Sequence, residues 1–95
     1  MLLQDAGGVG ARFISCSEEM NYCTIEGNIV GEDATSSELS KFFYSSGAGS
    51  AIVINNNLTY RLLNFIDAGS VTGGRKVGNL EIGTVNADSV GSGWT

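Results

Sequence analysis

The sequence contains no histidine and no proline, and only 16% of its residues are charged. Without histidine, the Ser–His and Cys–His pairs of nucleophilic catalysis and the usual catalytic zinc sites are excluded. Any remaining catalysis would need carboxylates, a lysine base or a metal bound by oxygen. We therefore predict that the protein is not an enzyme and that it holds no metal and no cofactor.

Basic residues are also scarce, with five Lys plus Arg against ten Asp plus Glu and a net charge of −5. Phosphate binding needs clustered basic residues, and an anionic membrane surface attracts them, so we expect neither nucleic acid nor membrane as a partner. No apolar run reaches the roughly 18 residues of a membrane span. The first residues lack the pattern of a signal peptide, which predicts synthesis in the cytoplasm without one; the alternative is that a processed N-terminus conceals export.

The chain has 95 residues, 14 of them glycine, and 42% of its residues are hydrophobic. The hydrophobic residues come in clusters, which favours a folded chain over a disordered one. We predict a single small domain over residues 1–95, with a flexible glycine-rich arm at 1–11 and a loop-like tail at 86–95. A domain of this size has a small core, so a partner or self-association would stabilise it.

One helix is predicted over about residues 36–46. The segment Thr35–Glu38 fits a capping box, and Leu39, Phe42 and Phe43 follow at helical spacing. Gly47 would end the helix.

The remaining segments indicate strands, because apolar and polar residues alternate in them. We read Asn55–Asn57 as a hairpin turn. The expected fold is α+β or mainly β, with the helix on a small antiparallel sheet of about five to six strands. No fixed-period repeat is visible, and the Asn-Leu-x-Ile spacing in the last third is only faintly similar to that of a solenoid. The expected inward-facing residues of the sheet are Ile52, Ile54, Tyr60, Leu62, Leu80 and Ile82.

Several short motifs have both a chemical and a structural interpretation. The stretch Gly69–Lys76 has the glycine spacing of a phosphate-binding loop, but Arg and Lys occupy its last two positions, so we read it as a turn. The carboxylates Asp67, Glu81 and Asp88 could form a glycosidase pair, yet surface acids are the simpler interpretation. The tripeptide Asn57–Thr59 matches a glycosylation sequon on the predicted turn.

Cys16 and Cys23 are the only two cysteines. They could close a small hairpin as a disulfide, provided that their Cα atoms lie within about 7 Å. Because no signal peptide is visible, we favour two reduced thiols in adjacent strands.

The composition, rich in Gly, Ser, Thr and Asn and poor in Lys, resembles that of small structural proteins of viral and phage particles and of extracellular assemblies. We therefore expect a structural, non-enzymatic protein that assembles with copies of itself and with other structural proteins, in a virion or an extracellular assembly. It could be a shell, decoration or tail component. The residues predicted to lie at the interface are Trp94, Val9, Leu2 and Leu3. The alternative is a small, acidic, monomeric binding module or inhibitor of a basic protein target.

Overall fold

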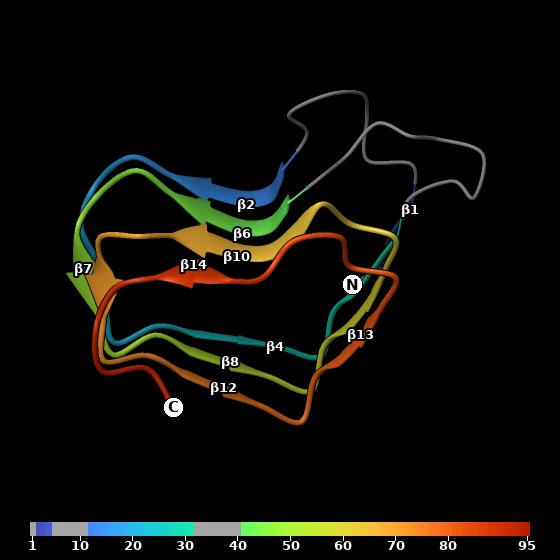
Figure 1. Cartoon of the computed structure of the whole chain (residues 1–95). Helices are drawn as coiled ribbons and strands as arrows, with labels where there is room; N and C mark the ends of the chain where they lie inside the picture. The colour runs from blue at the N-terminus through green and yellow to red at the C-terminus, as the bar shows by residue number, and fades with distance from the viewer. Residues whose placement is uncertain (1, 5–11, 32–40) are drawn as a thin grey trace.

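The computed structural model describes residues 2–4, 12–31 and 41–95 (Figure 1). In these ranges every regular element is a short β-strand. The chain runs through the strands in a repeating order, so that each turn contributes one strand to each of four sheets.

Two of the sheets have four strands each. Sheet A contains, in spatial order, β1 (Leu2–Gln4), β5 (Ile29–Gly31), β9 (Leu58–Tyr60) and β13 (Leu80–Ile82). Sheet B contains β2 (Arg12–Cys16), β6 (Lys41–Ser45), β10 (Asn64–Ala68) and β14 (Ser89–Val90).

The other two sheets have three strands each. Sheet C contains β3 (Met20–Asn21), β7 (Gly49–Ser50) and β11 (Val71–Thr72). Sheet D contains β4 (Thr24–Glu26), β8 (Val53–Asn55) and β12 (Arg75–Val77). We refer to one turn of chain as a rung: rung 1 is 12–31, rung 2 is 41–63, rung 3 is 64–85, and rung 4 is 86–95.

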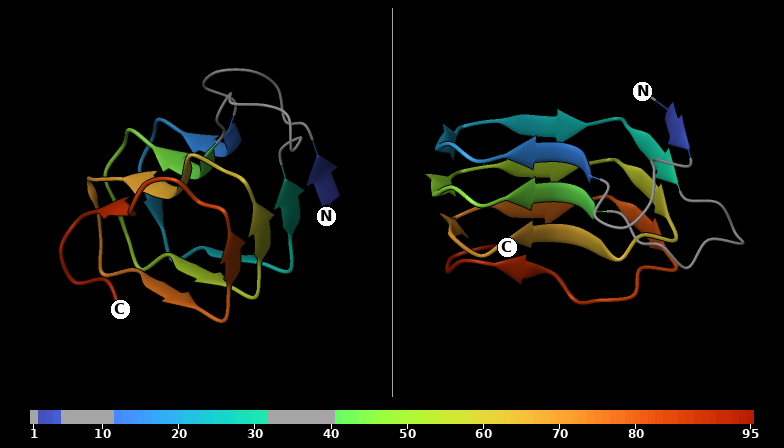
Figure 2. Two further views of the ribbon diagram at one scale, coloured as in Figure 1. Left: turned by 45° about the vertical axis from the view of Figure 1, so that its right-hand side comes forward. Right: turned by 90° about the horizontal axis from the view of Figure 1, so that it is seen from above.

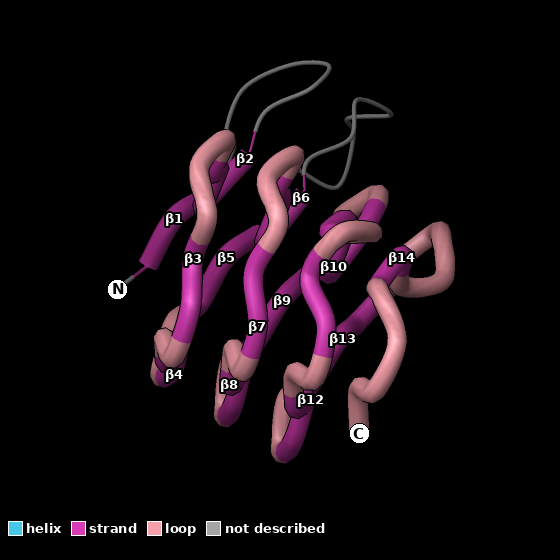
Figure 3. The backbone as a smooth tube through the Cα atoms, turned by 90° about the vertical axis from the view of Figure 1, so that its left-hand side faces the viewer, coloured by secondary structure: helices cyan, strands magenta, loops and turns pink. Residues whose placement is uncertain are grey.

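All strand pairs are parallel, and each strand pairs with the equivalent strand of the next rung. Ile25 lies beside Ile54, and Ile54 lies beside Lys76. The first step is 29 residues and the second is 22, because the segment between β5 and β6 is longer than its counterpart between β9 and β10. A coil of stacked parallel strands is a β-solenoid (Figures 2 and 3).

The corners between sheets are turns that need a left-handed backbone. At the corner between sheets D and A, Gly27, Asn56 and Gly78 have φ values of 73°, 53° and 69°. Glycine adopts this conformation without steric cost and asparagine tolerates it, which explains why these residue types recur at one corner.

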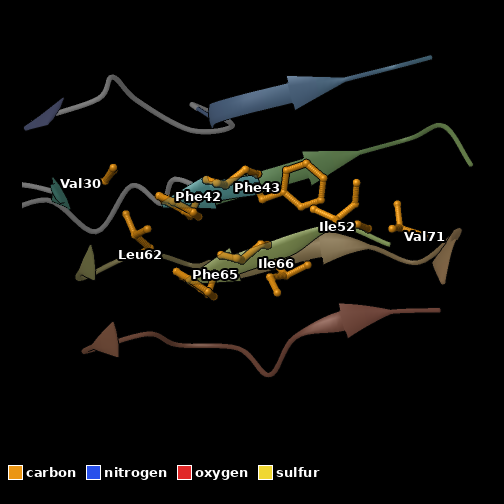
Figure 4. Packing of buried hydrophobic residues seen from close by; sticks show 11 residues of the cluster. Val30, Phe42, Phe43, Ile52, Leu62, Phe65, Ile66 and Val71 are labelled. Carbon is orange, nitrogen blue, oxygen red and sulfur yellow. The ribbon is translucent and has the colours of Figure 1, made fainter. Parts of the chain in front are cut away.

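The interior of the solenoid is filled by columns of side chains from successive rungs (Figure 4). Phe13, Phe42 and Phe65 form an aromatic stack, with ring centroids 5.3 Å and 4.8 Å apart. A second column contains Ile14, Phe43 and Ile66, which share one register. Phe42, Phe43, Phe65 and Ile66 are fully buried. The apolar core is therefore a set of columns that run along the solenoid axis.

The expected helix and antiparallel sheet are both wrong. Lys41–Ser45 forms strand β6 and Ser46 follows it in a bend, whereas residues 36–40 of the predicted helix, together with its capping box, lie outside the described residues. Phe42 and Phe43 are both buried in this strand. Two adjacent apolar residues are compatible with a buried strand as well as with one face of a helix, so this pair did not distinguish the two. The sheets are parallel because each strand pairs with the next rung rather than with its neighbour in sequence. Asn55 accordingly ends β8, and Asn56 and Asn57 form a corner of the solenoid and not a hairpin.

Half of the predicted inward residues lie inside. Ile52, Ile54 and Leu62 are fully buried. In contrast, Tyr60, Leu80 and Ile82 face outward and are 43%, 58% and 42% exposed, because Thr59 and Glu81 occupy the inward positions of β9 and β13.

The two ends of the predicted domain contain strands of the solenoid. Residues 2–4 of the predicted arm form β1, and its other residues lie outside the described part. The predicted tail contains β14 and stacks on rung 3: the Gly91 amide donates to the Val71 carbonyl at 2.9 Å, and the Thr95 amide donates to the Gly74 carbonyl at 3.0 Å.

Candidate interaction surface

An asparagine ladder holds the corner between sheets D and A. The side chain of Asn57 is buried, and its amide donates to the Ile25 carbonyl at 3.0 Å and to Oδ1 of Asn79 at 2.9 Å. Its Oδ1 accepts from the backbone and side-chain amides of Asn28, both at 3.0 Å. Asn79 in turn donates to the Ile54 carbonyl at 2.8 Å. The ladder satisfies the polar groups that the corner buries, and so fixes the shape of the surface next to it.

The outer face of sheet A is apolar. Its outward positions form one column of Ile29, Leu58 and Leu80 and a second column of Gly31, Tyr60 and Ile82. The large side chains of Ile29, Tyr60, Leu80 and Ile82 are exposed, and Leu58 is half-buried. None of the outward positions on β5, β9 and β13 carries a charge. We call these six residues the apolar face.

A shallow groove of about 400 Å³ runs beside the apolar face along the asparagine corner. Its floor combines the first apolar column, Ile29, Leu58 and Leu80, with the backbone of the corner turns. At Gly78 an added Cβ would collide with Oδ1 of Asn56, so this position of the corner is restricted to glycine. The groove therefore borders the apolar face on the side of the asparagine corner.

Three interior columns change from uncharged to charged residues in the last rungs. In the first column, Ile25 and Ile54 are followed by Lys76. In the second column, Val30 and Thr59 are followed by Glu81. The column of Ile14, Phe43 and Ile66 is followed by Asp88, since Asp67 pairs with Ser89.

The three charged residues meet at one point, and we call them the charged triad. Lys76 Nζ lies 2.8 Å from Glu81 Oε2 and 2.5 Å from Asp88 Oδ2. It also lies 5.3 Å from the ring centroid of Phe65, which places the ammonium over the end of the aromatic stack. Asp88 Oδ1 accepts from the Ile66 amide at 3.3 Å. The charged triad therefore lies against the apolar core beside Phe65, between rung 3 and rung 4.

The pKa of Lys76 is raised above the ordinary lysine value of 10.5. Burial is the largest single influence and by itself lowers this pKa, because it disfavours the charged amine. The hydrogen bonds and the negative charges of Asp88 and Glu81 together outweigh it. Lys76 is therefore held as a cation by its two partners.

The carboxylates considered as a catalytic pair are part of ion pairs. Glu81 and Asp88 come together, but both bind Lys76. Asp67 instead binds Lys41 on sheet B, with Lys41 Nζ 2.5 Å from Asp67 Oδ2. They are half-buried rather than freely solvated, so the surface-acid interpretation missed their pairing.

The predicted interface residues do not form one surface among the described residues. Trp94 packs against the core of its own chain and donates from Nε1 to the Val71 carbonyl at 2.8 Å. Its ring covers Gly74, where an added Cβ would overlap it. Leu2 and Leu3 belong to β1, whose backbone pairs with β5, and Val9 lies outside the described residues. Contact of these residues with another copy stays a prediction.

The remaining motifs have structural roles in the solenoid. Gly69–Lys76 contains strand β11 and the start of β12, and only its glycine-containing pairs at 69–70 and 73–74 lie in turns. Asn57 of the sequon is buried and its side chain is fully used in the ladder, so the folded chain does not present it as a glycosylation acceptor. Cys16 and Cys23 are half-buried free thiols, each hydrogen-bonded to a nearby backbone carbonyl.

The described part of the chain contains no group of three or more Cys, Asp or Glu residues placed to hold a metal ion. It also contains no helix of the length and apolar character that crossing a membrane requires. In comparisons with protein-family models, with curated proteins and with solved structures, none matched this chain.

Sequence reasoning missed both the apolar face and the charged triad. The signal for the solenoid was a corner motif that occurs three times: a left-handed residue, an asparagine and then Ile or Leu, at Gly27–Ile29, Asn56–Leu58 and Gly78–Leu80. Aligning the chain on these motifs puts Lys76 and Glu81 in register with apolar or uncharged positions of the preceding rungs. The same alignment puts the outward residues of sheet A in columns.

Proposed function

We propose that this protein is a structural, non-enzymatic assembly protein that associates with copies of itself through the apolar face. The exposed apolar columns of sheet A are the observation that supports this proposal. Large apolar side chains gathered on one face of a soluble protein are typical of an interaction surface. A particle shell, a tail or a similar surface assembly is the setting that fits such a protein.

A second copy is the partner that fits the apolar face best. The chain carries a net charge of −5, so copies repel one another unless they meet where neither presents a charge. The apolar face meets this condition, and two such sheets can pack face to face at a spacing of about 10 Å. A two-fold axis would bring the same columns of both copies together.

The contact is expected to be weak between two copies. Strands of three residues are about 10 Å long, and three of them side by side span about 14 Å. The apolar face therefore covers an area of about 140 Å², which is far below the roughly 800 Å² per partner of a standard interface. A contact of this size holds in a larger assembly only where other contacts between the copies act together with it.

Sedimentation over a wide concentration range tests the proposal. We expect the average mass of the protein to rise with concentration, and the double variant Tyr60→Ser/Ile82→Thr to need about tenfold more protein for the same rise. A matched double variant on the outer face of sheet C, Ser50→Ala/Thr72→Ser, should behave like the unchanged protein. A stable monomer at the highest concentrations would contradict the proposal and favour the acidic binding module.

A further inference from the structure

The charged triad holds a primary amine in contact with two carboxylates. Lys76 Nζ lies 2.5 Å from Asp88 Oδ2 and 2.8 Å from Glu81 Oε2. The same Nζ lies 5.3 Å from the ring centroid of Phe65. Groups that a fold holds in reacting contact behave as if present at about 10⁵–10⁸ M, which favours condensation of an amine with a carboxyl group. The charged triad therefore contains the reactants of an amide bond.

We propose that Lys76 and Asp88 join in an isopeptide bond, and that Glu81 transfers the protons of this reaction. The bond forms between Lys76 Nζ and Asp88 Cγ, and the bond between Cγ and Oδ2 breaks. Of the three ammonium protons, one stays on the amide nitrogen and two leave with Oδ2 as water, so no further reactant is needed. One positive and one negative charge disappear, which leaves the net charge at −5.

The amine must lose a proton before it can attack the carboxyl carbon. Burial disfavours the charged amine and is the largest single influence on the pKa of Lys76, although its two partners raise this pKa overall. Glu81 can accept a proton from Nζ and deliver it to Oδ2, the oxygen that leaves. The neutral amine is a minor form, so the reaction is slow and the ion pair is the state that precedes it. Only the unreacted chain keeps an amine at Lys76 that can titrate.

A backbone amide is placed to stabilise the reacting carboxyl group. The Ile66 N–H donates to Asp88 Oδ1, the oxygen that does not leave, at 3.3 Å. Negative charge develops on this oxygen when the amine adds to Cγ, and a fixed hydrogen-bond donor stabilises such charge. After water has left, Oδ1 is the carbonyl oxygen of the new amide and keeps the same donor.

The ion pair of Lys41 and Asp67 provides a comparison within the same chain. Lys41 Nζ also lies 2.5 Å from a carboxylate oxygen. Among the described residues, however, no second carboxylate forms an ion pair with Lys41, so the group that would transfer protons is missing. We expect this pair to stay ionic.

The isopeptide bond would join sheet D to the residue before β14. Rung 4 would then stay attached to rung 3 even when the hydrogen bonds between them break. This inference does not rest on the proposed function, because it concerns the interior of one chain and not the apolar face. Sedimentation measures the association of copies separately, so either proposal can fail without the other.

Mass spectrometry of the whole folded chain, incubated at neutral pH, tests the proposal. We expect a mass that falls below the mass of the sequence by one water molecule. Chymotrypsin cleaves denatured protein after Leu80, between the two linked residues, and the peptides on either side should stay joined through Lys76 and Asp88. Glu81→Gln should slow the loss of water by at least about 100-fold, because general acid–base catalysis contributes a factor of this size.

Lys76→Arg separates the reaction from ion pairing. The guanidinium keeps the positive charge and can bind both carboxylates, but it stays protonated and does not attack a carboxyl group. We expect this variant to give a β-type circular dichroism spectrum and to keep its full mass. The matched control Lys41→Arg should lose water as fast as the unchanged protein.

Three results would overturn the proposal. The first is a folded, unchanged protein that keeps its full mass after prolonged incubation. The second is a loss of water without joined peptides, which would indicate a cyclic imide at an aspartate. The third is linkage at an equal rate in Glu81→Gln, since Glu81 would then transfer no protons. If Lys76→Arg fails to fold, the joined peptides of the unchanged protein decide.

Discussion

Thr59 lies at an inward position of β9, fully buried between Val30 and Glu81 in its column. Its hydroxyl has no hydrogen-bond partner among the described residues. An unpaired buried hydroxyl costs free energy that a methyl group of similar shape would not. Thr59→Val should therefore raise the free energy of unfolding by about 1 kcal/mol, measured by urea denaturation. Thr72→Val, at an exposed position of sheet C, is the control and should change it little; a less stable Thr59→Val protein would contradict the prediction.

Asn57 is the middle member of the asparagine ladder and bonds to rungs on both sides. Asn57→Ala would leave the Ile25 carbonyl and the amides of Asn28 without their partner. We expect a loss of about 3 kcal/mol of stability, since each buried group left unpaired costs roughly 1–3 kcal/mol. Asn28→Ala is the comparison and should cost less, because Asn28 stands at the end of the ladder. Equal losses in chemical denaturation would show that the ladder does not act as a connected unit.

Lys76 should make stability fall at alkaline pH. Its pKa is raised in the folded protein, so its ion pairs stabilise the fold below about pH 10.5 and this contribution is lost as pH rises through the folded pKa. We expect the stability difference between the unchanged protein and Lys76→Met to shrink between about pH 10 and pH 12. Urea denaturation at a series of pH values measures it. A difference that stays constant over this range would show that Lys76 is not held as a cation by its partners.

At the scale of elements, the aromatic stack ties β2, β6 and β10 together. Phe42 touches a ring on each side, whereas Phe13 touches one, and Phe42 is fully buried. Phe42→Ala should cost about 3–5 kcal/mol, which is the usual range for a buried phenylalanine. Phe13→Ala should cost less, and thermal denaturation of both variants provides the comparison. A larger loss for Phe13→Ala would place the centre of the core in rung 1.

The strands were more predictable than their pairing. Alternation of apolar and polar residues located β4 and β13, and the apolar run Ala51–Ile54 located β8. Alternation does not say which of two faces is inside, and this is why Leu80 and Ile82 were placed in the core. The partner of each strand lies 22 to 29 residues away, and the two different spacings conceal the repeat from a search for a fixed period.

The candidate site was less predictable than the strands. The apolar face consists of residue types that are usually buried, so a sequence pattern assigns them to the core. They can be recognised as outward-facing only when the inward columns are known. The charged triad needs three residues from different sheets to meet, and sequence spacing alone does not indicate that Lys76 and Asp88 touch. Both features follow from the register between rungs, which only the structure supplied.

At the scale of the whole molecule, rungs should be interchangeable units. A second copy of residues 41–63, inserted directly after Leu63, would add a rung whose inward residues match those on either side. We expect a folded protein whose denaturant sensitivity, the m-value, is about a quarter larger, because m scales with the surface that unfolding exposes. Inserting a copy of residues 64–85 after Val85 is the matched comparison. It would bury Lys76 and Glu81 in the middle of the core, and it should destabilise the fold. Equal stability of the two longer proteins would show that the columns do not determine stability.

The spacing between rungs also determines how this chain can fold. Strands joined by a hairpin can find each other after closing a loop of a few residues, whereas every strand pair here closes a loop of at least 22 residues. Such long-range contacts slow folding, because the entropy of closure is lost before the columns can pack. The first stable species must already contain two adjacent rungs, and the short connection between rungs 2 and 3 makes β6 and β10 the natural starting pair. Growth would then proceed outward from that pair toward both ends of the solenoid.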